Sequence, residues 1–402
     1  MSRPRLHVVA LSHLDTQWRW TARETARVHL PRTVDENEAL FERHRRYVLS
    51  FEGAWRYRML AEHDPARFAR VRARVREGRW FPAGAAHEAF DALLPAPESI
   101  VRQILYGSRW FERELGSAGR DLFLPDCFGF PAILPTIAVH CGIVGFSTQK
   151  LRRGERMRSA FGIPFPYGRW RGPDGAELLA ALDPGEYSGR IEGDLARDPS
   201  WLKRFADLAA RDGGHRLLFY VGVGDRGGAP PEATIANLER ALDTGGPIEV
   251  RHGPSEQIFL ETSDEERGAL PVYDGELLLQ IHATGCYTAK AAMKRWHRET
   301  LRLARAAESA DAAASLGDGS SARGRLETAW THLLAHQMHD DLTGTSIPAA
   351  YRLSLEDLGY AANELAELLL DGVARAAAAF DRTTGQEGLR LVLAPTGGER
   401  RE

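Results

Sequence analysis

Short apolar runs alternate with helix-like segments over residues 1 to about 260, and this alternation constrains the fold more than any other feature. The runs typical of strands are residues 7–11, 46–51, 79–84, 121–125, 143–149, 175–182 and 216–224. Segment 97–115 between them begins with a proline and a glutamate and has helically spaced apolar residues. We therefore predict an α/β protein with a mainly parallel sheet or barrel. In such folds, chemistry takes place beyond the carboxyl ends of the strands.

The composition changes after Gly275 to segments rich in Ala, Leu, Arg and Glu, which predict an all-α three-helix bundle. Its expected helices are residues 287–316, 323–339 and 350–381. The predicted domains are an α/β catalytic domain (1–265), a connector (266–284), the bundle (285–383) and the start of a β domain (384–402).

Charge and cysteine content exclude several classes of protein. The 52 basic and 55 acidic residues give a net charge of −3, which offers no electrostatic reason to bind nucleic acid. No apolar run is long enough to cross a membrane, and the first residues do not resemble a signal peptide. Cys127, Cys141 and Cys286 lie far apart without a CxxC pair, which suits a reducing compartment. We therefore expect a cytoplasmic location, with no nucleic-acid or membrane partner.

The first predicted strand is followed at once by His13 and Asp15. In an extended chain, side chains two residues apart point the same way, so this imidazole and carboxylate can converge on one point. Such a pair suits a divalent metal such as zinc. An aspartate cap beside a partly buried histidine would give the same pattern.

Two further acidic positions follow predicted elements. Asp126 comes directly after the strand at 121–125, and the helix predicted over 323–339 ends in His339, Asp340 and Asp341. Taken singly, Asp126 could be a helix N-cap and Asp340 a surface charge.

Together these motifs closely resemble glycoside hydrolase family 38, the metal-dependent retaining α-mannosidases. The resemblance covers nearly the whole chain and rests on segments in family order. They are HLDTQW (13–18), LPDCFGFPAILPTI (124–137) with HCGIVGFSTQKL (140–151), GDRGGAP (224–230), GELLLQIHATGCYTAKAAMKRWHR (275–298) and QMHDDLTGTSIPAAY (337–351). The family fold implies a parallel barrel-like domain, a three-helix bundle and then β domains, most of which appear to be missing here.

The resemblance also implies roles for individual residues. The matching zinc ligands are His13, Asp15, Asp126 and His339, and Asp126 also matches the catalytic nucleophile. The positions that match the sugar pocket are Trp18, Phe128, Lys150, His282 and Asp340. One Zn²⁺ per chain is expected, with Co²⁺ or Mn²⁺ as alternatives.

The sequence indicates the general acid/base residue less clearly than the nucleophile. Asp225 follows a strong apolar strand in the family's matching loop, but better-studied members carry a second aspartate where this chain has Arg226. Asp91, Asp194 and Asp341 are the alternatives, and Asp225 could also be a capped-turn aspartate.

Two features compete with this assignment. His332, His336 and His339 would share one face of a helix, and an HxxxH pair is a known zinc motif. Only His339 matches the family position, so we assign the other two to the helix surface or to contacts behind the ligands. Cys127 adjoins the nucleophile and is expected only to pack.

The resulting prediction is a zinc-dependent retaining exo-α-mannosidase that acts on an α-mannoside or oligosaccharide through a covalent glycosyl-enzyme on Asp126. One alternative is another metal-dependent carbohydrate hydrolase, such as a deacetylase, in which the metal activates water directly. Another is an inactive truncated homologue that only binds sugar. A homo-oligomer is compatible with the sequence.

Overall fold

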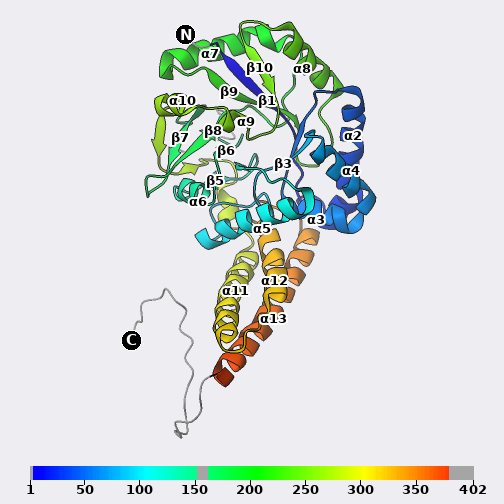
Figure 1. Cartoon of the computed structure of the whole chain (residues 1–402), viewed down its shortest axis with the longest axis vertical. Coiled ribbons are helices and arrows are strands. Elements are labelled where there is room, and N and C mark those ends of the chain that lie inside the picture. The colour runs from blue at the N-terminus through cyan, green and yellow to red at the C-terminus, as the bar shows by residue number, and fades with distance from the viewer. Residues whose placement is uncertain (1–2, 152–161, 380–402) are drawn as a thin grey trace.

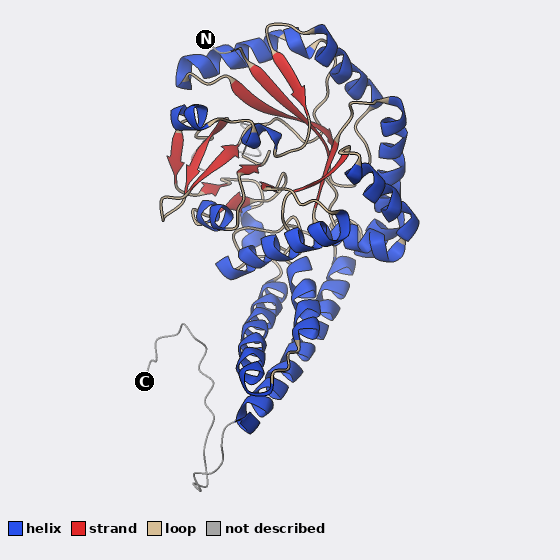
Figure 2. Cartoon of the chain, viewed as in Figure 1, coloured by secondary structure: helices blue, strands red, loops and turns tan. Residues whose placement is uncertain are grey.

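A computed structural model describes residues 3–151 and 162–379. Its upper part is an α/β domain with the strands inside and helices around them, and three long helices extend below it (Figures 1 and 2). The strand proposed near residues 384–402 lies outside the described residues. Among the described helices, none is both long and apolar enough to cross a membrane.

The first sheet is parallel throughout and has β1 at its centre. Its strands are β1 (Arg5–Ser12), β2 (Leu49–Glu52), β3 (Trp80–Ala83), β9 (Arg216–Val223) and β10 (Glu249–His252). β9 pairs with β1 along its whole length. The other edge of β1 pairs first with β10 and then with β2, which continues to β3. Nearly every residue of β1 is buried, which explains the apolar run at 8–11 within it.

The second sheet has the order β11-β7-β8-β6-β4. Its strands are β4 (Asp121–Phe123), β6 (Gly145–Ser147), β7 (Tyr167–Arg171), β8 (Glu177–Ala181) and β11 (Val272–Asp274). All its neighbours are parallel except β7 and β8, which form an antiparallel pair. A two-stranded sheet joins β5 (Gly129–Phe130) to β12 (Leu277–Leu278). The predicted α/β class with a mainly parallel sheet is confirmed.

Helices cover the outer faces of these sheets, and several begin at a proline or at an aspartate cap. They are α1 (Ala22–Glu24), η1 (Thr25–His29), α2 (Leu30–Arg43), α3 (Ala54–His63), α4 (Pro65–Arg76), α5 (Pro97–Leu115), α6 (Leu134–His140), η2 (Leu195–Arg197), α7 (Pro199–Asp212), α8 (Glu232–Thr244), α9 (Gln257–Leu260) and α10 (Asp264–Ala269). Asp64 and Asp198 accept hydrogen bonds from the first turns of α4 and α7. Helix α5 ends at Gly116, whose left-handed conformation suits a residue without a Cβ.

The bundle consists of α11 (Ala291–Asp318), α12 (Arg323–Ala335) and α13 (Pro348–Ala379), preceded by η3 (Thr284–Thr288). Its core includes Leu301, Trp330, Leu334, Leu358 and Leu365, all buried. The predicted three-helix bundle is therefore present, and it meets the α/β domain beneath α5 (Figure 1).

The second bundle helix ends at Ala335, so the prediction that it continues to His339 is wrong. Gln337 and Met338 N–H still donate to the carbonyls of Leu334 and Ala335, three residues earlier, but at His339 the backbone bonds to the α/β domain. His339 N–H donates to the carbonyl of Ala89 (3.1 Å), and Asp91 N–H donates to the carbonyl of Gln337 (2.8 Å). Phe90 and Met338 form the antiparallel bridge between these two bonds. We call this pairing of 89–91 with 337–339 the interdomain bridge.

Helix α5 approaches the loop after β3 closely because residue 107 is glycine. A Cβ at Gly107 would lie 2.2 Å from the carbonyl oxygen of Ala85. Since neither backbone can move freely, we expect Gly107→Ala to lower the free energy of unfolding by about 1–3 kcal/mol. Urea denaturation measures this change.

Gly359→Ala is the matched control, because Gly359 lies inside α13 and a Cβ there would meet nothing within 4 Å. This substitution should stabilise the protein by up to about 1 kcal/mol, as alanine favours a helix interior. Equal effects of the two substitutions would contradict the close packing of α5.

Candidate metal and catalytic centre

The candidate side chains lie where the strands end. His13 and Asp15 follow β1, Asp126 follows β4, Lys150 follows β6 and Asp225 follows β9. Because parallel strands present their carboxyl ends at one edge of the domain, segments far apart in the chain converge there.

His13, Asp15 and His339 meet in a buried cluster. Asp15 Oδ1 lies 3.1 Å from His13 Nε2 and 3.2 Å from His339 Nε2. The two imidazole rings have centroids 5.5 Å apart. The three side chains are 0–1% exposed. The bundle therefore supplies one histidine to a group whose other members come from the first strand.

Two further carboxylates reach the same imidazole. His339 Nε2 lies 3.6 Å from Asp126 Oδ2 and 3.5 Å from Asp340 Oδ2. Among the described residues, two overlapping triads bring all their donor atoms within 4.8 Å of one another. They are His13, Asp126 and His339, and Asp15, His339 and Asp340.

Three atoms at the centre of this cluster lack a hydrogen bond although they are buried. They are His13 Nε2, Asp15 Oδ1 and His339 Nε2, which are close together but not aligned as donor and acceptor. Buried polar atoms without partners are costly, so their convergence is what a cation-binding site requires. Imidazole nitrogens with carboxylate oxygens fit Zn²⁺, and also Co²⁺ or Mn²⁺.

Each histidine ring is held by its other nitrogen, which leaves Nε2 directed at the cluster. His13 Nδ1 donates to Glu52 Oε1 at 2.6 Å, and His339 Nδ1 donates to the carbonyl of Ala89 at 3.0 Å. Such contacts fix the tautomer and the orientation of a metal-binding imidazole. The interdomain bridge thus orients His339 as well as joining the domains.

Without a metal, protons neutralise the converging carboxylates. Burial alone would lower the pKa of His13, but the charges of Glu52 and Asp15 raise it to about 10. The pKa of His339 is also raised despite burial, chiefly by Asp340. Burial and the charge of Asp15 raise the pKa of Asp340. The site therefore demands positive charge, which either protons or a cation can supply.

Sequence analysis missed a buried chain of charges behind His13. Glu52, which accepts from His13, lies 3.6 Å from Arg56 Nη2, and Arg56 Nη1 donates to Glu88 Oε1 at 2.5 Å. Glu88 Oε2 in turn accepts from Thr16 Oγ1 at 2.7 Å. Asp126 was selected because it directly follows a predicted strand. The same criterion would have selected Glu52, which follows the strand predicted at 46–51 and is the last residue of β2. Arg56 and Glu88 carry no such signal.

Asp126 lies against a lysine that also follows a strand. Lys150 Nζ donates to Asp126 Oδ1 and lies 5.0 Å from the centre of the Phe128 ring. Although burial opposes ionisation, Lys150 and the two histidines hold the pKa of Asp126 well below its usual range. Phe128 meets the rings of His339 and His282 edge-on, at 5.7 and 5.8 Å between ring centres. Asp126 is therefore ionised beside an aromatic wall.

Asp225 is held in an uncommon backbone conformation next to the cluster. Its φ is 59°, a region that residues other than glycine seldom adopt. Its carbonyl accepts the N–H of Asp15 (2.8 Å), and its Oδ1 accepts from the hydroxyl of Tyr187 (2.7 Å). The ring of Tyr187 also stacks on His13, with centroids 5.4 Å apart. A Cβ at residue 224 would collide with that ring, which explains Gly224.

The other candidate acids have structural partners. Asp91 Oδ1 accepts from two backbone N–H groups and its Oδ2 from Tyr287. Asp194 caps η2 on the surface, where it also pairs with Arg197.

The remaining predicted residues lie around the cluster or behind it. Trp18 is partly buried, and its carbonyl accepts from Ile347 N–H at 2.8 Å. His282 is partly exposed beside Phe128. The buried Cys127 thiol donates to the carbonyl of Phe90 at 3.2 Å within the apolar core.

A second histidine–carboxylate group lies behind the turn that carries His339. His336 Nδ1 contacts Asp341 Oδ2 at 2.6 Å, and its Nε2 contacts Asp357 Oδ2 at 3.0 Å. His332 lies 3.4 Å from the same oxygen of Asp357. Ser354 Oγ donates to Asp341, and Gln17 Nε2 donates to Ser354 Oγ. This group joins α12, α13 and the loop after β1.

Comparisons with known proteins agree with this arrangement. The family described as "Glycosyl hydrolases family 38 N-terminal domain" matches residues 3–276, and "Alpha mannosidase middle domain" matches residues 281–375. The chain therefore belongs to glycoside hydrolase family 38, as the sequence motifs predicted.

Curated relatives are similar along most of this chain. Alpha-mannosidase 2C1 of Homo sapiens is 30% identical over 401 residues, covering 97% of this chain and 36% of the human protein. Alpha-mannosidase G of Dictyostelium discoideum is 29% identical over 352 residues, covering 87% of this chain and 31% of that protein. The chain thus spans about a third of the length of these relatives.

Solved structures share the fold. An alpha-mannosidase from Enterococcus faecalis V583 superposes with a TM-score of 0.76 at 20% identity, covering 94% of this chain and 43% of that one. The α/β domain and the helical bundle are thus arranged here as in that protein.

The His336 group predicts a dependence of stability on pH. Burial alone would lower the pKa of His336, but Asp341 and Asp357 raise it to about 9, above its ordinary value of 6.5. Its stabilising contribution is therefore complete below about pH 6.5 and is lost as the pH rises through 9. In chelator-treated protein, Asp357→Asn should reduce this loss by on the order of 1 kcal/mol.

Urea denaturation at pH 6.5 and 9.5 measures the effect. Other histidines titrate in both proteins, so only the difference between them reports on His336. Asp371→Asn, an exposed change on the same helix, is the control and should leave the decline unaltered. An equal decline in wild type and Asp357→Asn would show that the pair does not stabilise charged His336.

Proposed function

We propose that this chain is a zinc-dependent retaining exo-α-mannosidase, or the catalytic part of one, that removes terminal α-mannosyl residues. The observation that carries this proposal is the convergence of His13, Asp15, Asp126 and His339. Three of the central atoms, His13 Nε2, Asp15 Oδ1 and His339 Nε2, are buried without hydrogen-bond partners. Family membership supplies the reaction class, and the relatives' printed names supply the sugar.

Four side chains would hold the metal, namely His13, Asp15, Asp126 and His339. A bound Zn²⁺ would supply positive charge that binds substrate hydroxyl oxygens and orients the sugar. Glu52 and the carbonyl of Ala89 keep the two imidazoles directed at the ion. The buried location excludes water, which strengthens these electrostatic contacts.

Asp126 is the proposed nucleophile because it matches the family's nucleophile position, and its contact with Lys150 favours the ionised carboxylate. One of its oxygens would bond to the anomeric carbon as the bond from that carbon to the leaving oxygen breaks. Water then cleaves the resulting ester, which releases mannose and restores the carboxylate. Lys150, bonded to the same carboxylate, stabilises its charge between turnovers.

Asp225 is the proposed acid/base. It would give a proton to the leaving oxygen and later take one from the attacking water. Its support is its bond to Tyr187 beside the metal cluster, whereas Asp91, Asp194 and Asp341 are occupied by structural partners.

The sugar pocket would be lined by side chains around the metal cluster. We assign this role to Trp18, Phe128, Lys150, His282 and Asp340, which matches their family positions. The proposed domain limits remain a catalytic unit at 1–265, a connector at 266–284 and a bundle at 285–383. Since the bundle provides His339, both units are needed for the site. The free cysteines support the proposed cytoplasmic location.

The central test is hydrolysis of an aryl α-mannoside by metal-loaded and chelated protein. We expect one zinc per chain, loss of activity on chelation and recovery on adding Zn²⁺. Asp126→Asn should lower kcat by at least about 10³-fold, because it removes the nucleophile while keeping the shape.

A mechanism-based mannosyl label should attach to Asp126, and mass spectrometry of the peptides identifies the site. Release of acetate from acetylated sugars, with no label and no mannoside hydrolysis, would favour the deacetylase alternative. Binding of mannose without turnover would indicate a homologue that only binds sugar.

Glu52→Gln tests how the metal site is built. The amide oxygen accepts the His13 Nδ1–H bond more weakly than a carboxylate and carries no negative charge, so we expect zinc affinity to fall about 10–100-fold. Competition with a chromogenic chelator measures this. Glu239→Gln is the matched control, because Glu239 makes the same kind of bond to His44 on the outer surface, and it should leave zinc affinity unchanged. Equal zinc affinities of Glu52→Gln and wild type would refute this role.

A further inference from the structure

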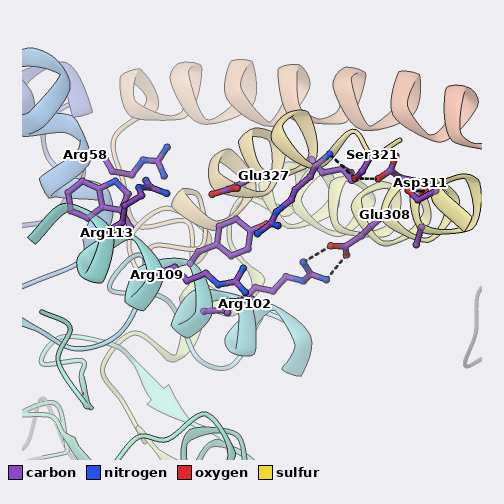
Figure 3. Close-up of a pocket in the computed structure, with 15 residues that line it drawn as sticks. Arg58, Arg102, Arg109, Arg113, Glu308, Asp311, Ser321 and Glu327 are labelled. Carbon is purple, nitrogen blue, oxygen red and sulfur yellow. Dashed lines mark hydrogen bonds and ion pairs between the residues drawn. The ribbon is translucent and has the colours of Figure 1, made fainter. Parts of the chain in front are cut away.

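A second cavity lies outside the metal cluster, between the α/β domain and the bundle. Its volume is about 460 Å³, and its walls are α5, the start of α12, the end of α11 and one side chain of α3. Figure 3 shows arginine side chains gathered around it. They are Arg58, Arg102, Arg109, Arg113 and Arg323. Neither the metal cluster nor the proposed reaction uses any of them.

Helix α5 separates this cavity from the catalytic centre. Arg102, Arg109 and Arg113 lie on its cavity side at helical spacing. Its opposite side carries Gln103, which bonds to the backbone N–H of Glu88 and to Gln337. The cavity is therefore separate from the metal cluster, and α5 contacts both the cavity and the segments that position the cluster.

Some of the charges around the cavity already have partners. Arg102 forms ion pairs with Glu98 and Glu308, so its charge is compensated. Asp311 is bonded to Arg375. Among the described residues, the exposed Arg113 forms an ion pair with its sequence neighbour Glu114 and with no other carboxylate.

The other three arginines have no such partner. Among the described residues, the guanidinium groups of Arg58, Arg109 and Arg323 form no ion pair or hydrogen bond. Arg109 and Arg323 are exposed, which makes an unpaired charge cheap. Arg58 is only partly exposed, and there an unpaired charge is costly.

Arg58 is the informative member of this group. Burial and then the charge of Arg113 lower its pKa, and the charges of Glu327, Glu62 and Glu114, which raise it, do not fully compensate. The guanidinium groups of Arg58 and Arg113 are therefore close enough to repel each other. Arginine remains charged in proteins, so the repulsion is not relieved by losing a proton. Figure 3 shows Arg58 and Arg113 together at one end of the cavity. A doubly charged anion between them would offset both charges with paired hydrogen bonds.

We propose that this cavity binds the phosphate ester of a sugar-sized molecule, with the phosphate between Arg58 and Arg113. A volume of about 460 Å³ is within the range of small-molecule sites and larger than a lone phosphate needs. The partly buried Tyr106 also lines the cavity, and it offers an aromatic side chain to a sugar. Glu327, which lies beyond the two arginines in Figure 3, offers a carboxylate to hydroxyl groups.

Isothermal titration of the metal-loaded chain with glucose 6-phosphate, inorganic phosphate and glucose tests this proposal. We expect glucose 6-phosphate to bind one per chain with a Kd on the order of 1 mM or tighter, and inorganic phosphate to bind more weakly. Glucose should show no binding that depends on Arg58. Equal affinities of phosphate and its ester would overturn the sugar part of the assignment, and no saturable binding of either would overturn the whole.

Variants locate the binding. Arg58→Gln and Arg113→Gln should each weaken glucose 6-phosphate at least about tenfold, because each removes a charged donor pair. Arg45→Gln removes the same charge from an exposed position away from the cavity and should leave the affinity unchanged. If Arg58→Gln fails to fold, the affinity of Arg113→Gln alone tests the site, because Arg113 is exposed and its substitution should not affect folding. Unchanged affinity in folded Arg58→Gln or Arg113→Gln would refute the site.

Discussion

The candidate centre depends on the interdomain bridge between residues 89–91 and 337–339. One carbonyl, that of Ala89, accepts both the backbone N–H and the ring Nδ1–H of His339. The bundle cannot shift along the α/β domain without breaking these bonds, and the imidazole cannot turn without losing one of them. Buried and water-free, the bridge fixes a side chain from one domain to within hydrogen-bonding distance of the other domain's carboxylates.

Charge balance sets a second requirement. Four buried carboxylates surround the two imidazoles, and each lies within 3.6 Å of a ring nitrogen of His13 or His339. They are Asp15, Asp126, Asp340 and Glu52. Arg56 and Lys150 offset part of this charge from behind, each bonded to a carboxylate. The remaining negative charge raises the pKa values of both imidazoles, chiefly through Glu52 and Asp15 at His13 and through Asp340 at His339. The same electrostatics that would destabilise an empty site therefore favour metal binding.

The sequence predicts buried strands well and half-exposed strands poorly. All strands proposed from apolar runs are present, as is α5 with its limits at Pro97 and Leu115. β7 and β10 escaped prediction because arginine, glycine or histidine interrupts their sequences, and β10 is only partly buried. The early end of α12 was equally hidden, since its cause is a hydrogen bond to Ala89, far away in the chain. Among the site residues, those after strands were visible, whereas Arg56 and Glu88 act through tertiary contacts that leave no local pattern.

Helix α5 has two working sides. On one side, Gln103 contacts the loop that contains Glu88 and the turn that leads to His339. On the other side, Arg102 and Arg109 line the cavity proposed to bind a sugar phosphate. Because residue 107 is glycine, this helix packs directly on the backbone at 85–87, with no side chain between them. A small rotation of α5 about its axis would displace both together. A ligand in the proposed outer site would therefore press on the same turn of helix that positions the proposed metal ligands.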